Sequence, residues 1–333
     1  MAEKDFKTYK EQILLLKRKK LIINDEVHAI ELLKRASYFA LINGYKKHFK
    51  ADNGNYKEET KIEDIEKLFV FDEKLRNYLL KYLLIIERNV KSSISYNFSQ
   101  KYRGALDYQN TLNYNYNVPS NIKDINELVS ILTSLCGKVK HPYIEHYQNK
   151  HDGKIPLWVL INAMTFGQVS KMYQLLQMGM QQKIASDLRI DSNKELGKML
   201  NLLTLFRNVC AHNERLYDYS VTSIDISKKY IQEVIDIDIN DIKVEQQARC
   251  ILGALVCCKK LLPKESSEDI FSELKIIIDN SFIDDNMKSI VEKDMGLPEN
   301  WHALIVRDNT KYITAEVALN EIKLDNNKEL VNV

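Results

Sequence analysis

Four polar side chains that could act on a phosphate lie within residues 206–219, FRNVCAHNERLYDY: they are Arg207, Asn208, His212 and Arg215. An imidazole has a pKa of about 6.5, so His212 can accept or donate a proton near neutral pH. A guanidinium offers planar, permanently charged donors to phosphate oxygens. The residue types therefore indicate a candidate site for acid–base chemistry at a phosphate.

The spacing of these residues predicts how a helix would present them. We expect a helix over residues 192–212, and at about 100° per residue an apolar stripe marks its buried side. The stripe consists of Leu202, Leu205, Phe206, Val209 and Asn213. Arg207 is expected on the opposite, solvent side, and His212 at the edge of the stripe beside Asn208. Because Arg207 and His212 diverge by about 140°, one chain makes a poor site. Two copies could surround one phosphate, so we expect a homodimer.

A purely structural interpretation of the same residues is open as well. A histidine at the edge of an apolar stripe is usually a packing residue, and an arginine on an outer helix face is usually only solvated. Glu214 and Arg215 can form local ion pairs at the helix end. The protein would then be a non-catalytic RNA-binding or protein-interaction module that uses the motif as a phosphate or dimer contact.

The elements that position these residues are expected to be helices. The 333 residues include 10 Gly and 5 Pro, and because both break helices, their scarcity favours long ones. We expect a scaffold helix of about 40 residues from Ile62 onward. Another helix is expected after a cap at Asn24 or Asp25, with Val27, Ile30 and Leu33 on its apolar side. Pro156 is expected to start a helix through LWVLINAMTFGQVSKMYQLLQ, and residues 221–230 are expected to be extended or a loop.

Further polar residues have expected roles of their own. Asp72 and Arg76, like Glu87 and Lys91, have the i,i+4 spacing of a helical salt bridge. A basic patch that could hold an RNA backbone, or be a solvated helix end, consists of Lys17, Arg18, Lys19, Lys20, Lys46 and Lys47, with Tyr45 beside it. Three histidines expected in a loop, His141, His146 and His151, have no standard zinc spacing, so no metal is expected.

Charge is divided unevenly along the chain, although its net value is only +2. Residues 221–333 hold 14 Lys+Arg and 21 Asp+Glu, while residues 1–220 hold 34 and 25. This division predicts a polyanionic partner for the first part, although two ordinary solvated surfaces would look the same. The five cysteines show no disulfide spacing, and no segment has about 18 uninterrupted apolar residues. We expect a cytoplasmic protein that does not enter a membrane.

The string from Arg207 to His212 fits the RxxxxH pattern of the HEPN superfamily, whose helical domains are often metal-independent, dimeric RNases. The chain also resembles the Abi-like (AbiD/AbiF) branch, abortive-infection proteins of bacterial phage defence. The matching pieces, in order, are YFALINGYKKHF, LFVFDEKLRNYLLKYLLIIERNVKSSISYNF, PLWVLINAMTFGQVSKMY, RNVCAHNERLYDY and GLPENWHALI. The chain differs at Lys20 in RKKLII, where the family pattern leads us to expect a glycine in the turn.

This resemblance implies an all-α, HEPN-type helical bundle with N-terminal and C-terminal helical extensions. We expect a basic segment at 1–60, the HEPN domain at 61–220 and an acidic extension at 221–333. The catalytic residues would be Arg207, Asn208 and His212. Residues supporting the active-site helix would be Asp72, Arg76 and Glu87, with Glu87 in reach of His212 or simply paired within its own helix. RNA is the expected substrate, a structured noncoding RNA is a second expected partner, and no cofactor is expected.

Overall fold

The computed structural model describes residues 5–138, 141–224, 226–235, 247–282, 284–299 and 301–302. Within these ranges the chain forms fourteen α-helices and, apart from isolated bridges, no strand, so the predicted all-α fold is confirmed. The α-helices are α1 (Tyr9–Arg18), α2 (Glu26–Ala36), α3 (Ile62–Lys101), α4 (Ile122–Lys138), α5 (Pro142–Lys150), α6 (Leu157–Leu160), α7 (Phe166–Leu175), α8 (Met178–Asp187), α9 (Asn193–Ala211), α10 (Lys228–Ile235), α12 (Ile251–Leu261), α13 (Lys264–Ser267), α14 (Ile270–Asp279) and α15 (Asp285–Asp294). Short 3-10 or π turns are η1 (Phe39–Asn43), η2 (Lys47–Phe49), η3 (Asp107–Gln109), η4 (Thr111–Asn113), η5 (Pro119–Asn121) and η6 (Ile161–Ala163).

Helix α3 is the scaffold of the molecule. It extends over 40 residues, which at 1.5 Å per residue is about 60 Å. No Gly or Pro interrupts it. The Asp64 carboxylate closes its first turn by accepting the backbone N–H of Lys61 at 2.9 Å. Buried apolar side chains recur at helical spacing from Ile65 to Phe98, so the predicted long helix is confirmed.

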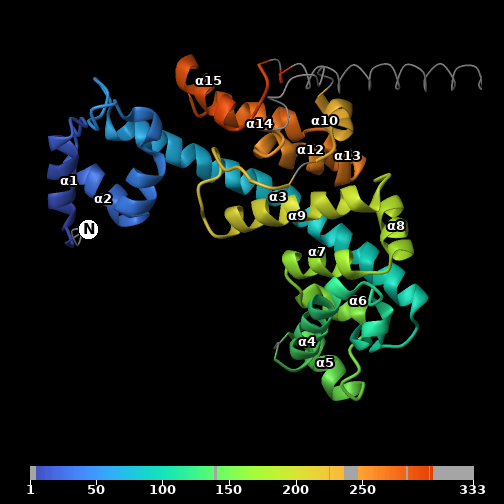
Figure 1. Cartoon of the computed structure of the whole chain (residues 1–333). Coiled ribbons are helices and arrows are strands. Elements are labelled where there is room, and N and C mark those ends of the chain that lie inside the picture. Colours follow the sequence, from blue (N-terminus) through green and yellow to red (C-terminus); the bar gives the residue numbers. More distant parts are fainter. Residues whose placement is uncertain are drawn as a thin grey trace, which may run out of the picture.

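The other helices are arranged around α3 (Figure 1). Helices α1 and α2 lie beside its first turns, and α4 and α5 lie near its far end. Helices α9, α12 and α14 pack against it. Arg76 bonds to the carbonyl of Glu214, just after α9, and Asn97 bonds to Asp187, just before α9. Helix α9 therefore runs antiparallel to α3.

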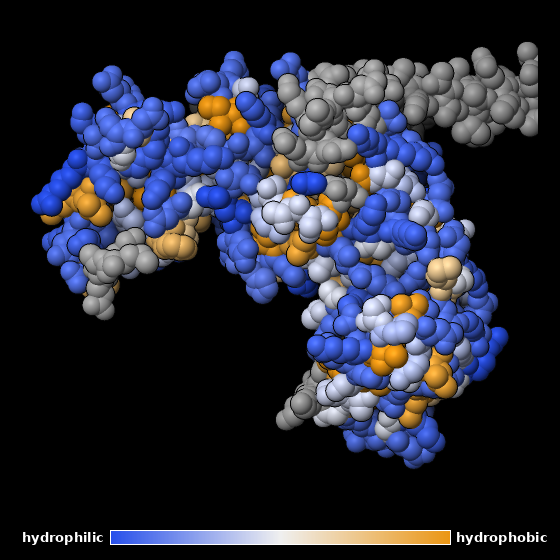
Figure 2. All heavy atoms as spheres, viewed as in Figure 1, coloured by the Kyte–Doolittle hydropathy of each residue, from blue (hydrophilic) through white to orange (hydrophobic). Residues whose placement is uncertain are grey.

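Figures 1 and 2 show an elongated, bent molecule with the N-terminal helices at one end and α4–α5 at the other. The C-terminal end of α9 lies in the open angle between these two ends (Figure 1). The face drawn in Figure 2 is largely hydrophilic, with apolar residues in small separate groups. Among the described residues, no helix is both long and apolar enough to cross a membrane.

Helix α9 matches the expected range, but its buried side differs in part from the prediction. Ser192 caps its first turn, with its side chain accepting the N–H of Glu195. Leu202, Phe206 and Val209 are buried as expected. Leu205 is 38% exposed, and Asn213 is exposed because the helix ends before it. The predicted apolar stripe therefore included two residues, Leu205 and Asn213, that are not buried.

Three other local predictions were wrong. Val27 is 74% exposed, whereas Leu33 is buried and Ile30 half-buried as expected; Ala29 and Leu32 complete the buried side of α2, and Asp25 caps this helix as expected. The three histidines predicted in a loop lie in or at the ends of α5. The helix expected after Pro156 is divided into α6, η6 and α7, because Thr165 forms a new capping box with Gln168.

The turn after α1 keeps the conformation that the family pattern implies. Lys20 has a φ of 65°, in the left-handed region that favours glycine. The N–H of Leu21 bonds to the carbonyl of Leu16 at 3.1 Å, and that of Lys20 bonds to Lys17 at 2.9 Å. These bonds form a Schellman motif. The lysine thus occupies the turn without changing its geometry.

Several expectations lie wholly or partly outside the described residues. Residues 221–224 and 226–227 form no helix or strand, consistent with the expected loop, but α10 already begins at residue 228. The piece GLPENWHALI is described only in part. The proposed division at residues 60 and 220 stays a prediction.

Candidate functional site

The end of α9 has the left-handed residue and the 6→1 bond of a Schellman turn. Asn213 has a φ of 56° and follows the C-cap residue His212. The N–H of Glu214 bonds to the carbonyl of Val209 at 3.1 Å, and that of His212 bonds to Asn208 at 2.9 Å. The chain therefore leaves α9 abruptly, and the histidine stands at the very end of the helix.

Arg207 does not project into solvent as predicted. Its side chain is 26% exposed, and its Nε lies 3.5 Å from Oε2 of Glu87 on α3. The other Glu87 oxygen accepts a hydrogen bond from Lys91 at 2.8 Å. The helical wheel of α9 alone placed Arg207 on the solvent side, because it could not include the Glu87 carboxylate that α3 presents beside this arginine. Of the two alternatives expected for Glu87, the structure shows the pairing with Lys91 on the same helix and not the contact with His212. Arg207 is an additional partner of this carboxylate.

A buried cluster on α3 holds the chain just after the motif. The Asp72 carboxylate accepts hydrogen bonds from the backbone N–H groups of Leu216 and Tyr217, the shortest at 2.7 Å. It also accepts from Tyr45 and Arg76, each at 2.6 Å. The Arg76 guanidinium in turn donates to the carbonyl of Glu214 at 3.3 Å. The predicted salt bridge is therefore present, and it fixes the segment that follows His212.

The electrostatics of this cluster follow from its burial. Burial raises the pKa of the Asp72 carboxyl, while the Tyr45 hydroxyl, the Arg76 guanidinium and two backbone amides oppose that shift. Tyr45 is itself buried and belongs to this cluster, so it is not part of an exposed basic patch. Within the motif, burial raises the pKa of the Cys210 thiol to about 12. This cysteine therefore stays protonated at neutral pH and is not a nucleophile.

Arg215 is held by its surroundings. Its Nε lies 2.6 Å from Asp218, and one terminal nitrogen donates to the carbonyl of Gly44. These contacts agree with the local ion pairing considered from the sequence, yet the side chain remains 39% exposed. Asp218 also lies 3.6 Å from Lys47. The segment after α9 is thus tied to the N-terminal part as well as to α3.

The cations of the predicted basic patch differ in their exposure and in their partners. Lys47 lies 3.4 Å from Asp294 of α15, and His48 lies 2.5 Å from the same carboxylate, so the acidic C-terminal part pairs with this lysine, whose side chain remains 55% exposed. Lys17 pairs with Glu26 at 2.5 Å, while Arg18, Lys19 and Lys20 are exposed.

A further cation, Lys50, lies close to Lys19 and Lys46. The sequence interpretation missed it, although it follows Lys46 by four residues. Burial, together with the charges of Lys19 and Lys46, lowers the pKa of Lys50 to about 8. Its ammonium lies 3.6 Å from the centre of the Tyr56 ring. Burial is the larger cause of this shift, and the two neighbouring lysines add like charge that a bound anion would offset.

The residues of the motif remain available for chemistry. Asn208 and His212 are exposed, and within the described residues neither side chain forms a hydrogen bond or ion pair. Arg207, Asn208 and His212 all lie on the last turn and a half of α9. The described part of the chain holds no group of three or more potential metal ligands. An acid–base group and an oriented cation therefore share one exposed helix end.

By its fold and site this is an all-α protein in which a long central helix, α3, supports the polar end of a second helix, α9. The chain belongs to the Abi-like protein family, whose sequence model matches residues 31–218, more than half of its length. The resemblance to the Abi-like family is thereby confirmed. The matched range contains both the cluster around Asp72 and the motif from Arg207 to His212. No match was found among curated proteins or solved structures.

Proposed function

We propose that this protein is a HEPN-type endoribonuclease that cleaves RNA without a metal ion. The observation that carries the proposal is the pairing of two features at one helix end. Arg207 is oriented by Glu87 from another helix, and His212 is exposed with an unengaged imidazole. A side chain needed only for packing would be buried or hydrogen-bonded, which His212 is not.

The chemistry follows from these groups. One His212 imidazole takes the proton of the 2′-hydroxyl, and the 2′-oxygen attacks the adjacent phosphorus. The Arg207 guanidinium stabilises the charge on the phosphorane. A protonated imidazole then donates its proton to the leaving 5′-oxygen, which yields a 2′,3′-cyclic phosphate and a 5′-hydroxyl. DNA lacks the 2′-hydroxyl and should resist cleavage.

A homodimer supplies the second acid–base group. One chain contributes a single histidine to this helix end, whereas the reaction requires both a base and an acid. Two α9 ends related by a two-fold axis would provide both groups around one phosphate. The angle between the two ends of the molecule stays open when all heavy atoms are drawn (Figure 2), and a second copy could approach the end of α9 there.

Membership of the Abi-like family favours a role as a toxin-like effector in phage defence. Its activity would be held in check until infection, and a structured noncoding RNA is our candidate for the restraining partner. The exposed cations of the N-terminal part, Arg18, Lys19 and Lys20, with Lys46 near Lys50, are the proposed contacts for its backbone. Arg215 is the proposed backbone contact beside the motif.

A cleavage assay tests the enzymatic proposal. Purified wild-type protein should cut RNA in excess chelator, and His212→Ala or Arg207→Ala should each lower the rate at least about 100-fold. Circular dichroism should show that both variants keep their helical content. Complete, reversible inhibition by the chelator would place the chemistry in a different class. Variants that still cut at the wild-type rate would remove these two residues from the mechanism, and wild-type protein that binds RNA without cutting it would favour a non-catalytic RNA-binding module.

A further inference from the structure

The last part of α3 carries positive charge without any carboxylate. From Arg88 to Arg103 the sequence RNVKSSISYNFSQKYR contains four Lys or Arg and no Asp or Glu. Arg88 and Arg103 are exposed, and within the described part of the chain neither side chain forms a hydrogen bond or ion pair. Such a stretch beside an RNA-cleaving site would attract a polyanion.

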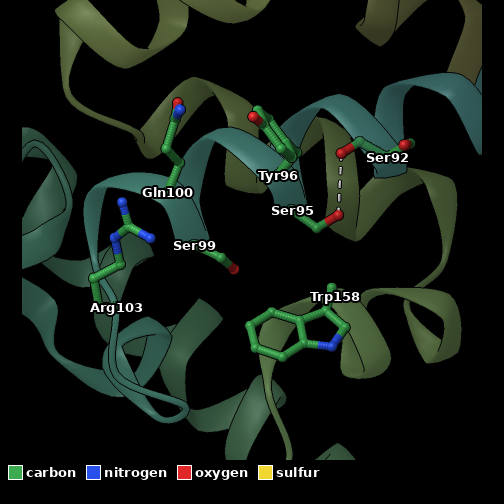
Figure 3. A pocket seen from close by; sticks show the side chains of 7 residues that line it. All are labelled: Ser92, Ser95, Tyr96, Ser99, Gln100, Arg103 and Trp158. Carbon is green, nitrogen blue, oxygen red and sulfur yellow. Dashed lines mark hydrogen bonds between the residues drawn. The ribbon is translucent and has the colours of Figure 1, made fainter.

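A hollow of about 460 Å³ opens on this stretch. It lies between α3 and α6 and is lined by Ser92, Ser95, Tyr96, Ser99, Gln100, Arg103 and Trp158. In Figure 3 the Ser95 and Ser99 hydroxyls point toward the indole of Trp158, and Arg103 stands at one end of the hollow. Gln100 and Tyr96 point away from it. The hollow is therefore bounded by an aromatic ring, small hydroxyls and a cation.

Trp158 is held in this position by its neighbours. It is 51% exposed, whereas Leu157 and Leu160 in the same short helix are buried and anchor α6 to the core. Exposing half of an indole is costly in water, and such a ring is a stacking surface for a nucleobase. The Ser95 hydroxyl already donates to the carbonyl of Ser92 at 3.1 Å. The Ser99 hydroxyl is free, within the described residues, to bond to a base or a ribose.

Arg88 connects the hollow with the candidate active site along one face of α3. It directly follows Glu87, which pairs with Arg207, and Ser92, Ser95 and Ser99 come 4, 7 and 11 residues after it. At about 100° per residue these four residues lie within about 60° of one another around the helix axis, and the rise from Arg88 to Ser99 is about 17 Å. An RNA strand cut at the motif could therefore pass Arg88 and reach Trp158.

We propose that this hollow is a binding subsite for one unpaired nucleotide of single-stranded RNA. Its base stacks on Trp158, its phosphate binds Arg103, and its ribose or base edge bonds to Ser99. Arg88 holds the backbone between the subsite and the motif. The proposal rests on the proposed function only in taking RNA as the ligand, and it defines an unpaired strand as the substrate class.

Tryptophan fluorescence tests the subsite directly, because the chain has two tryptophans and Trp301 is buried. The full-length His212→Ala protein should be titrated with a single-stranded RNA oligonucleotide, so that the probe stays intact. Stacking should quench the emission of Trp158 and protect it from acrylamide. Trp158→Ala in the same background should weaken binding about tenfold, Trp158→Phe should retain most of the affinity, and Arg103→Ala should weaken binding several-fold.

Matched controls separate this subsite from general effects. Phe6→Ala removes an aromatic ring that is 88% exposed before α1, and Lys123→Ala removes an exposed cation on α4; neither should change the affinity. Binding without quenching, or equal quenching by duplex RNA, would overturn the proposal. Quenching by RNA that wild-type protein never cleaves would keep the subsite and reject the nuclease. Cleavage of RNA by the wild-type protein without quenching of Trp158 would keep the nuclease and reject the subsite.

Discussion

Glu87 serves two cations at once, and this sharing determines how Arg207 is held. One carboxylate oxygen bonds to Lys91 and the other faces Arg207, with a side chain only 10% exposed. A nearly buried carboxylate is costly unless it is paired, so its presence between two cations suits a positioning role. The arginine is thereby kept on the α3 side of α9 rather than in free solution.

Replacing Glu87 with Gln should release Arg207 while preserving shape. We expect kcat to fall roughly 10- to 100-fold, because a misplaced cation stabilises the phosphorane poorly. KM should change little, and the pH profile should stay the same because His212 sets it. Glu87→Asp should restore part of the rate. Steady-state kinetics would show this, with Glu73→Gln, an exposed carboxylate on the same helix, as the matched control. An unchanged kcat in Glu87→Gln would exclude the positioning role.

Lys50 should make RNA binding sensitive to pH. Its pKa is lowered to about 8, so the side chain loses its charge as the pH rises through that value. A bound phosphate favours the ammonium form, and affinity should therefore be constant below pH 8 and decline above it. Lys50→Arg keeps its charge and should abolish the decline. Binding isotherms across this range would test it, and a flat wild-type profile well above pH 8 would contradict the role of Lys50.

At the scale of elements, α3 and the segment after α9 are joined through buried charges. Asp72 and Arg76 lie on α3 and together bond to the backbone of Glu214, Leu216 and Tyr217. The backbone groups of a segment that leaves a helix need partners when they are buried, and this pair supplies them. The cluster therefore determines where the chain goes immediately after His212.

Asp72→Asn should destabilise the protein strongly. The change leaves the Arg76 charge buried without its partner, which costs about 3–5 kcal/mol in the free energy of unfolding. Denaturant titration monitored by circular dichroism would measure the loss. Glu73→Gln, one residue further on the exposed side of α3, should stay within about 0.5 kcal/mol of wild type. A loss no larger than that of the control would mean that the cluster is not structurally important.

The helices were largely predictable from the sequence, whereas their mutual contacts were not. The 40-residue helix, the Asp25 cap and the range of α9 follow from local periodicity and capping, which act over a few residues. The orientation of Arg207 depends on Glu87, which lies 120 positions earlier in the chain. The hollow at Trp158 likewise exists only because α6 returns to α3. Such features depend on tertiary packing, which the spacing within one helix does not specify.

At the scale of the whole molecule, the distribution of charge bears on the proposed RNA and dimer contacts. The acidic C-terminal part contacts Lys47 and His48 through Asp294, so it neutralises part of the basic N-terminal region. Other cations, among them Arg18, Lys19 and Lys20 and, on and just after α3, Arg88 and Arg103, are exposed and can meet a polyanion. A second copy facing the end of α9 would complete the proposed site.

Mixing inactive and active chains tests the composite site. If both histidines of a dimer are needed, an equilibrated equal mixture of wild type and His212→Ala should retain about one quarter of the activity rather than half. The same mixture with Glu73→Gln should retain full activity. Light scattering should show a dimer throughout. Activity that falls only in proportion to the mutant fraction, with a monomer in solution, would reject the shared site.

The two attachments on either side of His212 also bear on how this family can diverge. Arg207 is fixed to Glu87, and Leu216 and Tyr217 are fixed to Asp72, so both ends of the intervening stretch are tied to the same rigid helix. One inserted residue would rotate His212 by about 100° around α9 or pull the backbone off Asp72. Apart from Asn208 and His212, individual amino acids between these points should tolerate substitution, whereas insertions and deletions there should not be tolerated. We therefore expect the number of residues between Arg207 and Tyr217 to vary less among members of the family than the identity of most of those residues.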